Sequence, residues 1–342
     1  MINQNIIFTA PGVAELVAKE LPPLGADQVL VKTVRDTISP GTERANLIGD
    51  PNTSYAKPGE VKFPRHLGYS ISGEIVAVGA DVQDLCVGDR VFCAWSKHAQ
   101  YNVMKAKNVY RLDSAINFDE AALIHIATFP LAAIRKCRLE VGESALVMGL
   151  GVLGLLGVQL LRAAGAVPII AVDPVPHKRE QALALGADYA LDPFAPDFVK
   201  TVKDLTDGGV KVALEITGNG GGMDMALDCM AKFGRMALLG CTRNSDFSID
   251  YYRKVHGPGI TLVGAHTMAR PQSESSAGWW TEADDERAIM RMLLHKRLNF
   301  KCLIEEVHNP SDAPAVFTRL ATEKHFPVVQ FDWSLYREEH TK

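Results

Sequence analysis

The chain has 342 residues, of which 47% are apolar and 22% charged, and its formal net charge is −4 at pH 7. This length predicts two domains, and the apolar share provides for two cores. The weakly acidic balance, without a run of Lys and Arg, argues against nucleic acid or acidic lipid as a partner. No stretch approaches the roughly 20 apolar residues that span a bilayer, and the N-terminus lacks a signal-peptide pattern. We therefore expect a cytoplasmic protein that does not bind membranes.

The cysteines form no Cys-x-x-Cys pair and no pattern typical of structural zinc. In a cytoplasmic chain we expect them to be reduced, and most of them to be buried as small apolar residues. They are Cys86, Cys93, Cys137, Cys229, Cys241 and Cys302.

The first third of the chain consists of short segments rich in β-branched and apolar residues, separated by Pro and Gly. This spacing is typical of a partly closed β-barrel. The expected strands cover residues 5–8, 28–34, 72–78, 89–93 and 99–103, with turn signals at Pro22-Pro23, Ser39-Pro40-Gly41, Lys57-Pro58-Gly59 and Val87-Gly88-Asp89.

The pattern changes near residue 119, where Asp119 and Glu120 predict a helix start because acidic side chains favour the positive end of a helix dipole. From residue 144, short apolar runs alternate with helical segments, which predicts a parallel sheet with helices on both faces. The expected strands cover residues 145–148, 169–172, 189–191, 212–216, 236–239 and 260–263, with helices over 178–185 and 198–205, and the tail adds a helix over 282–295 and a strand near 328–331.

A Gly-x-Gly-x-x-Gly motif follows the first strand of this sheet and opens an apolar helix. Gly149 permits a tight turn, Gly151 lets the backbone approach a pyrophosphate, and Gly154 lets helix and strand pack closely. The backbone N–H groups of Val152 and Leu153, at the helix start, are then expected to bind the phosphates.

The next expected strand ends in Asp173, at the spacing from the glycine motif that is typical of a ribose-binding carboxylate. A carboxylate there binds both hydroxyls of an adenosine ribose and repels a 2′-phosphate, so Asp173 indicates NAD rather than NADP. Lys178 and Arg179 follow closely and weaken this preference for NAD, because a cation there can bind the 2′-phosphate of NADP. We expect NAD as the cofactor, with Lys178 beside it.

Three further strand ends are expected at the same carboxyl edge, where ligands of open α/β sheets bind. Glycine at a strand end permits close backbone approach to a cofactor. For the glycine run at residues 220–222, an ordinary loop remains an alternative. The cofactor-site candidates at these ends are Thr217, Gly218, Gly240, Cys241, Ala265 and His266.

Several motifs in this order resemble the medium-chain dehydrogenase/reductase superfamily, whose best-known members are zinc alcohol dehydrogenases. They are Gly41-Thr42-Glu43, Gly68-Tyr69-Ser70 with the strand that follows, Val87-Gly88-Asp89-Arg90-Val91, the glycine motif with Asp173, and Leu185-Gly186-Ala187-Asp188. The resemblance covers essentially the whole chain. It implies an α/β protein in which a GroES-like β-barrel catalytic domain (1–125 and 267–342) is interrupted by a Rossmann doubly wound parallel-sheet domain (126–266). It also implies a homodimer or homotetramer and adds Thr128 to the cofactor site.

The zinc ligands of that superfamily do not carry over. Zinc members have a Cys where this chain has Ser39-Pro40, and they read Gly-His-Glu where this chain has Gly68-Tyr69-Ser70. A catalytic zinc needs three good N, S or O ligands. We therefore predict no bound metal, with Glu43, His66, His98 and His125 as the remaining candidate ligands. These runs resemble a zinc-poor branch that includes bacteriochlorophyllide dehydrogenases and sugar or polyol dehydrogenases.

Without zinc, hydrogen-bond donors or a proton acceptor must stabilise the alkoxide that forms as hydride leaves. Thr42 matches a Ser or Thr that relays the proton in the zinc relatives. Tyr69 and His66 flank the vacated metal position, and His98 lies on the loop toward the next strand. Glu43 is placed to orient one of them. Each has a structural alternative: an ion-pair partner for Glu43, a packed aromatic for Tyr69, a loop contact for His66 and a surface position for His98.

The sequence thus predicts an NAD(H)-dependent oxidoreductase that transfers hydride between nicotinamide and a secondary alcohol or ketone. The expected substrate is a small molecule: a sugar, a polyol or a hydroxylated metabolite. A quinone or enoyl reductase is one alternative, although such enzymes usually prefer NADPH. A catalytically silent NAD-binding redox sensor is another, because the zinc ligands are missing.

Overall fold

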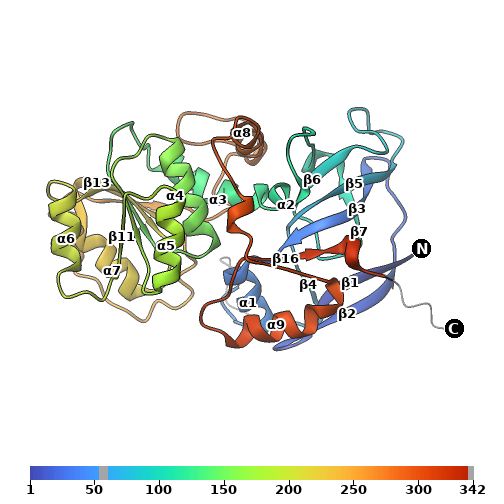
Figure 1. Cartoon of the computed structure of the whole chain (residues 1–342), viewed down its shortest axis with the longest axis horizontal. Coiled ribbons are helices and arrows are strands. Elements are labelled where there is room, and N and C mark those ends of the chain that lie inside the picture. Colours follow the sequence, from blue (N-terminus) through green and yellow to red (C-terminus); the bar gives the residue numbers. More distant parts are fainter. Residues whose placement is uncertain (54–60, 338–342) are drawn as a thin grey trace. The chain divides into compact units, whose positions relative to one another are not determined.

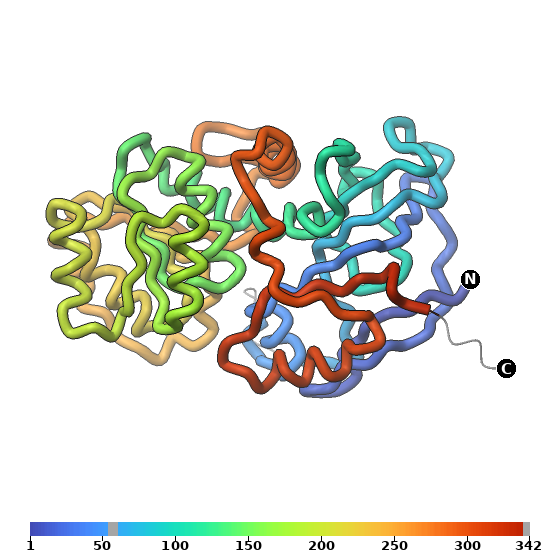
Figure 2. The backbone as a smooth tube through the Cα atoms, in the orientation of Figure 1, coloured from blue at the N-terminus to red at the C-terminus, as the bar shows by residue number. Residues whose placement is uncertain are grey.

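The computed structural model describes residues 1–53 and 61–337, so the turn predicted at Lys57-Pro58-Gly59 lies outside the described residues. The chain forms two compact units, one from Met1–Ile126 with Asn299–Lys342 and one from Ala127–Leu298. Figure 2 shows the chain leaving the first unit for the second and returning to it for its last part. The second unit is therefore an insertion in the first.

The first unit is built from two sheets, in the strand orders β2-β1-β4 and β15-β16-β3-β5-β6-β8, with β7 also paired to β3. All of these pairs are antiparallel except β15 with β16. This arrangement confirms the predicted barrel. The strands are β1 (Ile2–Ala10), β2 (Val13–Glu20), β3 (Gln28–Thr37), β4 (Arg65–His66), β5 (Ser70–Val78), β6 (Arg90–Ala94), β7 (Tyr101–Lys105), β8 (Val109–Arg111), β15 (Glu306–His308) and β16 (Val329–Asp332).

The helices of the first unit are α1 (Pro40–Ile48), α2 (Phe118–Ala121) and α9 (Ala313–Thr322), with 3₁₀ turns at Ala106–Asn108, Lys301–Leu303, Pro310–Asp312 and Trp333–Leu335. Helix α3 (Ile124–Lys136) continues into the second unit. Two apolar clusters hold the first unit together. One lies inside the barrel around Val31 and Ile71. The other joins α9 to the sheets around Phe8, Phe317 and Phe331.

The second unit contains a parallel sheet, with helices such as α4, α5 and α6 around it (Figure 1). The sheet has six strands in the order β11-β10-β9-β12-β13-β14. Counted within the unit, this is the order 3-2-1-4-5-6 of a dinucleotide-binding doubly wound sheet, whose switch point lies between β9 and β12. The strands are β9 (Ala145–Met148), β10 (Ile169–Val172), β11 (Tyr189–Leu191), β12 (Val210–Glu215), β13 (Met230–Leu238) and β14 (Thr261–Gly264). The predicted Rossmann sheet is confirmed.

Helices cover both faces of this sheet. Val147 faces α4, because a Cβ built on Gly154 would lie 3.5 Å from its side chain. Its neighbours Leu146 and Met148 face the opposite way and pack in the cluster that contains side chains of α6 and α7. The helices are α4 (Val152–Ala163), α5 (Pro176–Ala184), α6 (Phe198–Leu205), α7 (Gly220–Asp228) and α8 (Glu282–Leu294), with a π-helical turn at Tyr252–His256.

The unit boundary after β14 differs from the predicted one. Residues 267–298 were expected in the catalytic domain, but in the structure they pack within the second unit. Arg135 Nε on α3 lies 2.8 Å from Asp285 Oδ1 on α8, and its guanidinium stacks on Trp280 at 3.5 Å from the ring centroid. Arg270 donates to Thr128 O at 3.0 Å. These contacts join segments far apart in sequence, so periodicity did not reveal them.

Two helices begin where the sequence suggested a turn or left a loop as an alternative. Ser39-Pro40-Gly41 begins α1, because Pro at the first helical position already has the φ of a helix and needs no N–H partner. The glycine run at residues 220–222 forms the first turn of α7, where Asn219 Oδ1 accepts a hydrogen bond from Gly222 N at 2.8 Å. Across residues 1–53 and 61–337, no helix is both long and apolar enough to cross a bilayer.

Candidate functional site

The glycine motif forms a loop from the end of β9 into α4. Gly149 has a φ of +99°, a conformation that side chains disfavour. A Cβ on Gly154 would lie 2.0 Å from Gly149 O, so only glycine allows α4 to lie this close to the loop. A Cβ on Gly151 would meet nothing within 4 Å, which leaves open space beside the backbone. The loop thus has a tight turn, a close helix contact and a vacant flank, as the sequence predicted.

Helix α4 points its N-terminus at this loop. Gly151 is the N-cap residue and provides no side-chain acceptor. The N–H groups of Val152 and Leu153 belong to the first helical turn, where no intrahelical carbonyl is available to them. Together with the helix dipole they favour an anion, and the vacant side of Gly151 gives a pyrophosphate access. The loop therefore fits a dinucleotide.

Asp173 follows β10 and is buried beside the loop. Its Oδ2 accepts a hydrogen bond from Leu150 N and its Oδ1 one from Val175 N, both at 2.9 Å. A carboxylate has about four lone-pair sites, so each oxygen keeps room for a ribose hydroxyl. Arg179 Nη1 donates to Asp173 O at 2.7 Å, whereas Lys178 is half-buried on α5. The predicted carboxylate and both predicted cations therefore lie at one strand end.

The ends of β12 and β13 are fixed by Glu215 and by glycine contacts. Glu215 is buried, and its Oε1 accepts hydrogen bonds from Thr217 N at 2.8 Å and Gly218 N at 3.3 Å. Burial raises the pKa of Glu215, and the hydrogen bonds from Thr217 and Gly218 partly oppose that rise. A Cβ on Gly240 would lie 2.4 Å from Gly218 N, and one on Gly218 would lie 2.9 Å from Cys241 O. These glycines are needed where the two strand ends meet, so their presence alone does not indicate a cofactor.

The remaining cofactor candidates also have structural partners. Thr128 Oγ1 accepts a hydrogen bond from Arg270 Nη2 at 3.1 Å, and both residues are buried. Ala265 is buried, and His266 Nδ1 accepts from Met268 N at 3.2 Å. Burial and the positive charge of Lys136 lower the pKa of His266.

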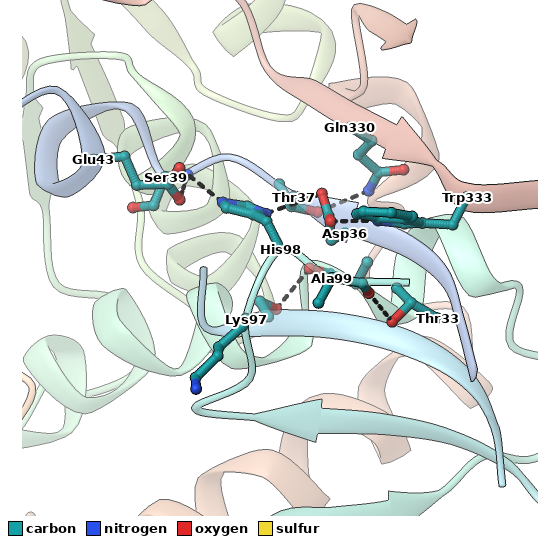
Figure 3. A network of polar contacts seen from close by, with 12 residues as sticks. Thr33, Asp36, Thr37, Ser39, Glu43, Lys97, His98, Ala99, Gln330 and Trp333 are labelled. Carbon is teal, nitrogen blue, oxygen red and sulfur yellow. Dashed lines mark hydrogen bonds and ion pairs between the residues drawn. The ribbon is translucent and has the colours of Figure 1, made fainter. Parts of the chain in front are cut away.

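His98 lies in a buried network of charged groups, which Figure 3 shows from close by. Its Nε2 lies 2.9 Å from Glu43 Oε2 and its Nδ1 lies 3.1 Å from Asp36 Oδ1. Glu43 also accepts from Ser39 N at 2.8 Å, and Asp36 accepts from Trp333 Nε1 at 2.6 Å. The imidazole therefore bridges β3, the start of α1 and the end of β16.

This network is inaccessible to a substrate. The side chains of His98 and Glu43 are each 1% exposed and that of Asp36 is 0% exposed. Burial lowers the pKa of His98, but attraction and hydrogen bonding by Glu43 and Asp36 outweigh burial and hold that pKa well above its ordinary value. The two carboxylates that face the ring of His98 thus favour its protonated form. Direct catalytic contact, expected for Glu43 and His98, does not agree with this burial. The structural alternative for Glu43, an ion-pair partner, is what the structure has, and the surface alternative for His98 is wrong.

Tyr69 lies in a cluster of rings. Its ring centroid lies 6.3 Å from that of Trp95 and 5.7 Å from that of His125. Trp95 has a φ of +62°, which is rare for a bulky residue and is maintained mainly at functional sites. Gly68 precedes Tyr69, and a Cβ there would lie 2.5 Å from His98 N, so this turn requires glycine. The sequence analysis missed Trp95, because nothing in the sequence reveals its backbone conformation.

The other two predicted catalytic residues, Thr42 and His66, lie on α1 and β4. Thr42 is half-buried in α1, next to Glu43. His66 lies on β4, where its Nε2 is 3.1 Å from Lys19 Nζ. The five predicted residues therefore have different surroundings. Glu43 and His98 belong to the buried ion network and Tyr69 to the ring cluster. Thr42 lies on α1, and His66 pairs with Lys19.

The positions that hold zinc in zinc relatives carry unsuitable donors. Ser70 Oγ donates to Ala122 O at 2.6 Å, and Ser39 is buried at the start of α1. Tyr69 offers a phenol in place of an imidazole. Among the described residues of the first unit, no three His, Cys, Asp or Glu side chains bring ligand atoms within 4.8 Å of one another. This donor set does not fit a catalytic zinc.

The cysteines are all free. Three are buried, as expected: Cys93, Cys137 and Cys229. The other three are exposed: Cys86, Cys241 and Cys302. The prediction that most of the thiols are buried is therefore only half right.

Known proteins match both units. The alcohol dehydrogenase GroES-like domain family matches residues 25–124 and the zinc-binding dehydrogenase family matches residues 152–280. L-threonine 3-dehydrogenase of Pyrococcus horikoshii is 32% identical over 289 residues, which cover 76% of this chain and 81% of that protein. D-guloside 3-dehydrogenase of Escherichia coli is 27% identical over 331 residues, 91% of this chain and 94% of that protein. Galactitol-1-phosphate dehydrogenase of E. coli shares the fold with a TM-score of 0.81 at 20% identity, covering 96% of this chain and 99% of that chain.

Proposed function

Because the chain belongs to the medium-chain, zinc-type alcohol dehydrogenase superfamily, we propose that it oxidises a secondary alcohol with NAD and without a catalytic zinc. Membership makes it an oxidoreductase that acts on alcohols, polyols or sugars and uses NAD or NADP. The substrate class that we favour is a sugar, a polyol or a related hydroxylated metabolite. The catalytically silent alternative is set aside by this membership.

The choice of NAD rests on Asp173. Its carboxylate lies beside the glycine loop and keeps free lone pairs for two ribose hydroxyls, and its charge repels a 2′-phosphate. When bound, the nicotinamide accepts a hydride from the alcohol carbon. The N–H groups of Val152 and Leu153 would hold the pyrophosphate at the start of α4. Preference for NAD also argues against the NADPH-linked quinone or enoyl reductase.

The alkoxide that forms as hydride leaves needs hydrogen-bond donors in place of a metal. We assign this role to the hydroxyl groups of Tyr69 and Thr42. His98 acts at a distance: its contact with Glu43 holds the N–H of Ser39 and the first turn of α1, which carries Thr42. His98 and Glu43 are thus positioning residues. Trp95, with its strained backbone and its contact with Tyr69, offers an apolar ring face to a sugar.

A purified-enzyme assay tests the chemistry. Sugars, polyols and simple alcohols are offered with NAD and with NADP, and turnover of a secondary alcohol with NAD is expected. Tyr69→Phe removes one hydroxyl and keeps the ring, so turnover is expected to fall about 100- to 1000-fold while NADH affinity stays unchanged. Tyr110→Phe is the matched control, because Tyr110 stacks on Phe92 at 4.7 Å within the barrel. Normal turnover by Tyr69→Phe would remove that hydroxyl from the mechanism.

A binding titration tests the cofactor choice. The unmodified protein is expected to bind NADH more tightly than NADPH. Asp173→Ser is expected to reduce the ratio of the two affinities, because it removes the charge that repels the 2′-phosphate and leaves the cation of Arg179 nearby. Asp188→Ser is the control: Asp188 Oδ2 accepts from Ile169 N at 2.7 Å at the opposite end of β10. Equal or tighter NADPH binding by the unmodified protein would contradict the assignment.

The oligomeric state is proposed to be a homodimer or homotetramer. In the parallel sheet, β14 is an edge strand whose paired neighbour among the described residues is β13. An edge strand presents unpaired N–H and C=O groups to a second copy. Light scattering of the purified protein is expected to give two or four times the mass of one chain.

A further inference from the structure

A polar pocket of about 270 Å³ opens on the first unit. It is bounded by β1, β2, β4, β7 and the loop after β6. The side chains that matter for its chemistry are Lys19, Glu20, His66, Ser96, Lys97 and Tyr101. Every lining residue belongs to the first unit, so the pocket is complete within one compact body.

Two lysines in this pocket have no carboxylate partner among the described residues. Lys19 Nζ lies 3.1 Å from His66 Nε2, which makes the neutral imidazole its acceptor. Lys97 lines the same pocket as His66. Burial first, and then the charges of Lys19 and Lys97, lower the pKa of His66. Figure 3 shows the Lys97 side chain leading away from the His98 network. Glu20 lines the exposed edge without forming an ion pair to a described residue, so the pocket remains cationic.

Ser96 provides a second, independent indication of a ligand. Ser96 is one of the residues that line the pocket, it is 3% exposed, and its Oγ is buried without a hydrogen-bond partner among the described residues. A buried hydroxyl without a partner costs about 1–3 kcal/mol, so such groups usually have an acceptor or a donor that the protein itself does not supply. A ligand oxygen in the pocket would supply it.

The walls of the pocket are held by hydrogen bonds that leave these head groups available. Asn3 Nδ2 donates to Tyr101 O and Asn3 Oδ1 accepts from Tyr101 N, both at 2.9 Å. Asn102 Oδ1 accepts from Lys97 N at 2.9 Å, and its Nδ2 donates to Lys97 O at 3.1 Å. The amides thus fix the backbone on which Lys97 stands, and a preorganised wall lowers the entropic cost of binding.

We propose that this pocket binds a phosphoryl oxyanion through Lys19, Lys97 and Ser96. Two ammonium groups and a hydroxyl supply the charge-assisted donors that such an anion needs. The volume is slightly below the usual range for drug-sized ligands, so it suits inorganic phosphate or the phosphate end of a small ester. The phosphoryl group has two possible sources: free phosphate, or a phosphorylated substrate. The second source rests on the proposed dehydrogenase function, since Trp95 both lines the pocket and contacts Tyr69.

The test is a calorimetric titration of the full chain with inorganic phosphate. Excess NADH is present throughout, so that the glycine loop is occupied and cannot bind the phosphate. Saturable binding is expected for the unmodified protein. Lys97→Gln and Lys19→Gln are each expected to weaken it about tenfold, which corresponds to about 1.4 kcal/mol. Lys97→Arg should restore most of the affinity. Lys32→Gln, an exposed lysine on β3, is the matched control and should bind normally.

No saturable binding by the unmodified protein would overturn the proposal, and so would unchanged binding by the Lys19→Gln/Lys97→Gln double variant. Ser96→Ala should weaken binding without lowering stability, because its hydroxyl has no partner to lose. Turnover assays then identify the source. Phosphate that competes with the alcohol indicates a phosphorylated substrate, and phosphate that binds without competing indicates free phosphate. Because binding is measured without turnover, failure of the pocket and failure of the dehydrogenase assignment are distinguishable.

Discussion

At the scale of single residues, one electrostatic feature is the position of the His98 ring between two buried carboxylates. Removing one partner of such a network leaves an uncompensated charge in the core, which costs about 3–5 kcal/mol. Asp36 and Glu43 would then face each other in apolar surroundings, since the His98 ring lies 6.0 Å from that of Phe317. The free energy of unfolding should therefore depend on whether His98 is protonated.

The thermal stability of the unmodified protein should depend on His98 in a pH-dependent way. The pKa of His98 is higher in the folded state than in the unfolded state. Its contribution is complete below about pH 6.5, the unfolded value, and is lost as pH rises through the folded pKa. The melting temperatures of the unmodified protein and His98→Asn should thus differ most near pH 6 and converge toward alkaline pH.

Calorimetric scans at several pH values measure this difference. His325→Asn is the control, because His325 is exposed and its removal should give a small difference at every pH. If His98→Asn does not fold, Glu43→Gln replaces it, since that variant keeps the shape and removes one charge. A difference for His98→Asn that grows with pH would mean that the imidazole is neutral in the folded protein.

The sequence identified important residues of the candidate site more readily than it identified their roles. The position of Asp173 beside the glycine loop followed from its spacing after the glycine motif, because a βαβ unit brings that strand end to the loop by local connections. The burial of His98 depends on Asp36 and on Trp333, which donates to Asp36 across 297 positions of the chain. A histidine in a loop looks like a surface or catalytic residue until those partners are placed.

At the scale of elements, the loop between β9 and α4 assigns different roles to two glycines that look alike in sequence. A Cβ on Gly154 would lie 2.0 Å from Gly149 O, whereas one on Gly151 would meet nothing within 4 Å. Gly154→Ala must therefore move α4 away from the loop. Gly151→Ala leaves the protein intact but fills the space proposed for the pyrophosphate.

The two alanine variants should separate packing from cofactor binding. Gly154→Ala is expected to lower the melting temperature and NADH affinity together, because overpacking typically costs about 1–3 kcal/mol. Gly151→Ala is expected to melt normally and to bind NADH at least tenfold more weakly. Calorimetry and fluorescence titration measure the two quantities on the same samples. Normal NADH affinity in Gly151→Ala would place the pyrophosphate elsewhere.

The strands of the parallel sheet were predicted well because they are short apolar runs, of which β9 and β10 are buried along their whole length. Residues 169–172 and 189–191 match β10 and β11 residue for residue. Helices α1 and α7 were missed because their first turns contain Pro and Gly, which normally signal turns. In α7 the glycines serve packing, since a Cβ on Gly222 would lie 2.3 Å from Thr217 Oγ1. Local composition does not distinguish a glycine that ends a helix from one that lets a helix pack.

At the scale of the whole molecule, the chain consists of two units with their own cores, one inserted into the other. The first boundary was predictable because the pattern changes there from short strands to helix. The second was not, because Trp280 and Asp285 are tied to Arg135 by stacking and charge rather than by sequence pattern.

The metal content is a property of the whole molecule, because zinc ligands in this superfamily come from segments far apart in the chain. Ser39, Tyr69 and Ser70 occupy the positions of the usual ligands, and Ser70 Oγ already donates to Ala122 O. We expect well under one zinc per chain by elemental analysis of protein purified without added metal. On the proposal that catalysis uses no zinc, dialysis against a chelator should leave turnover and melting temperature unchanged. Stoichiometric zinc that resists dialysis would contradict this prediction, and single substitutions of His66 and His125 would then show which histidine holds it.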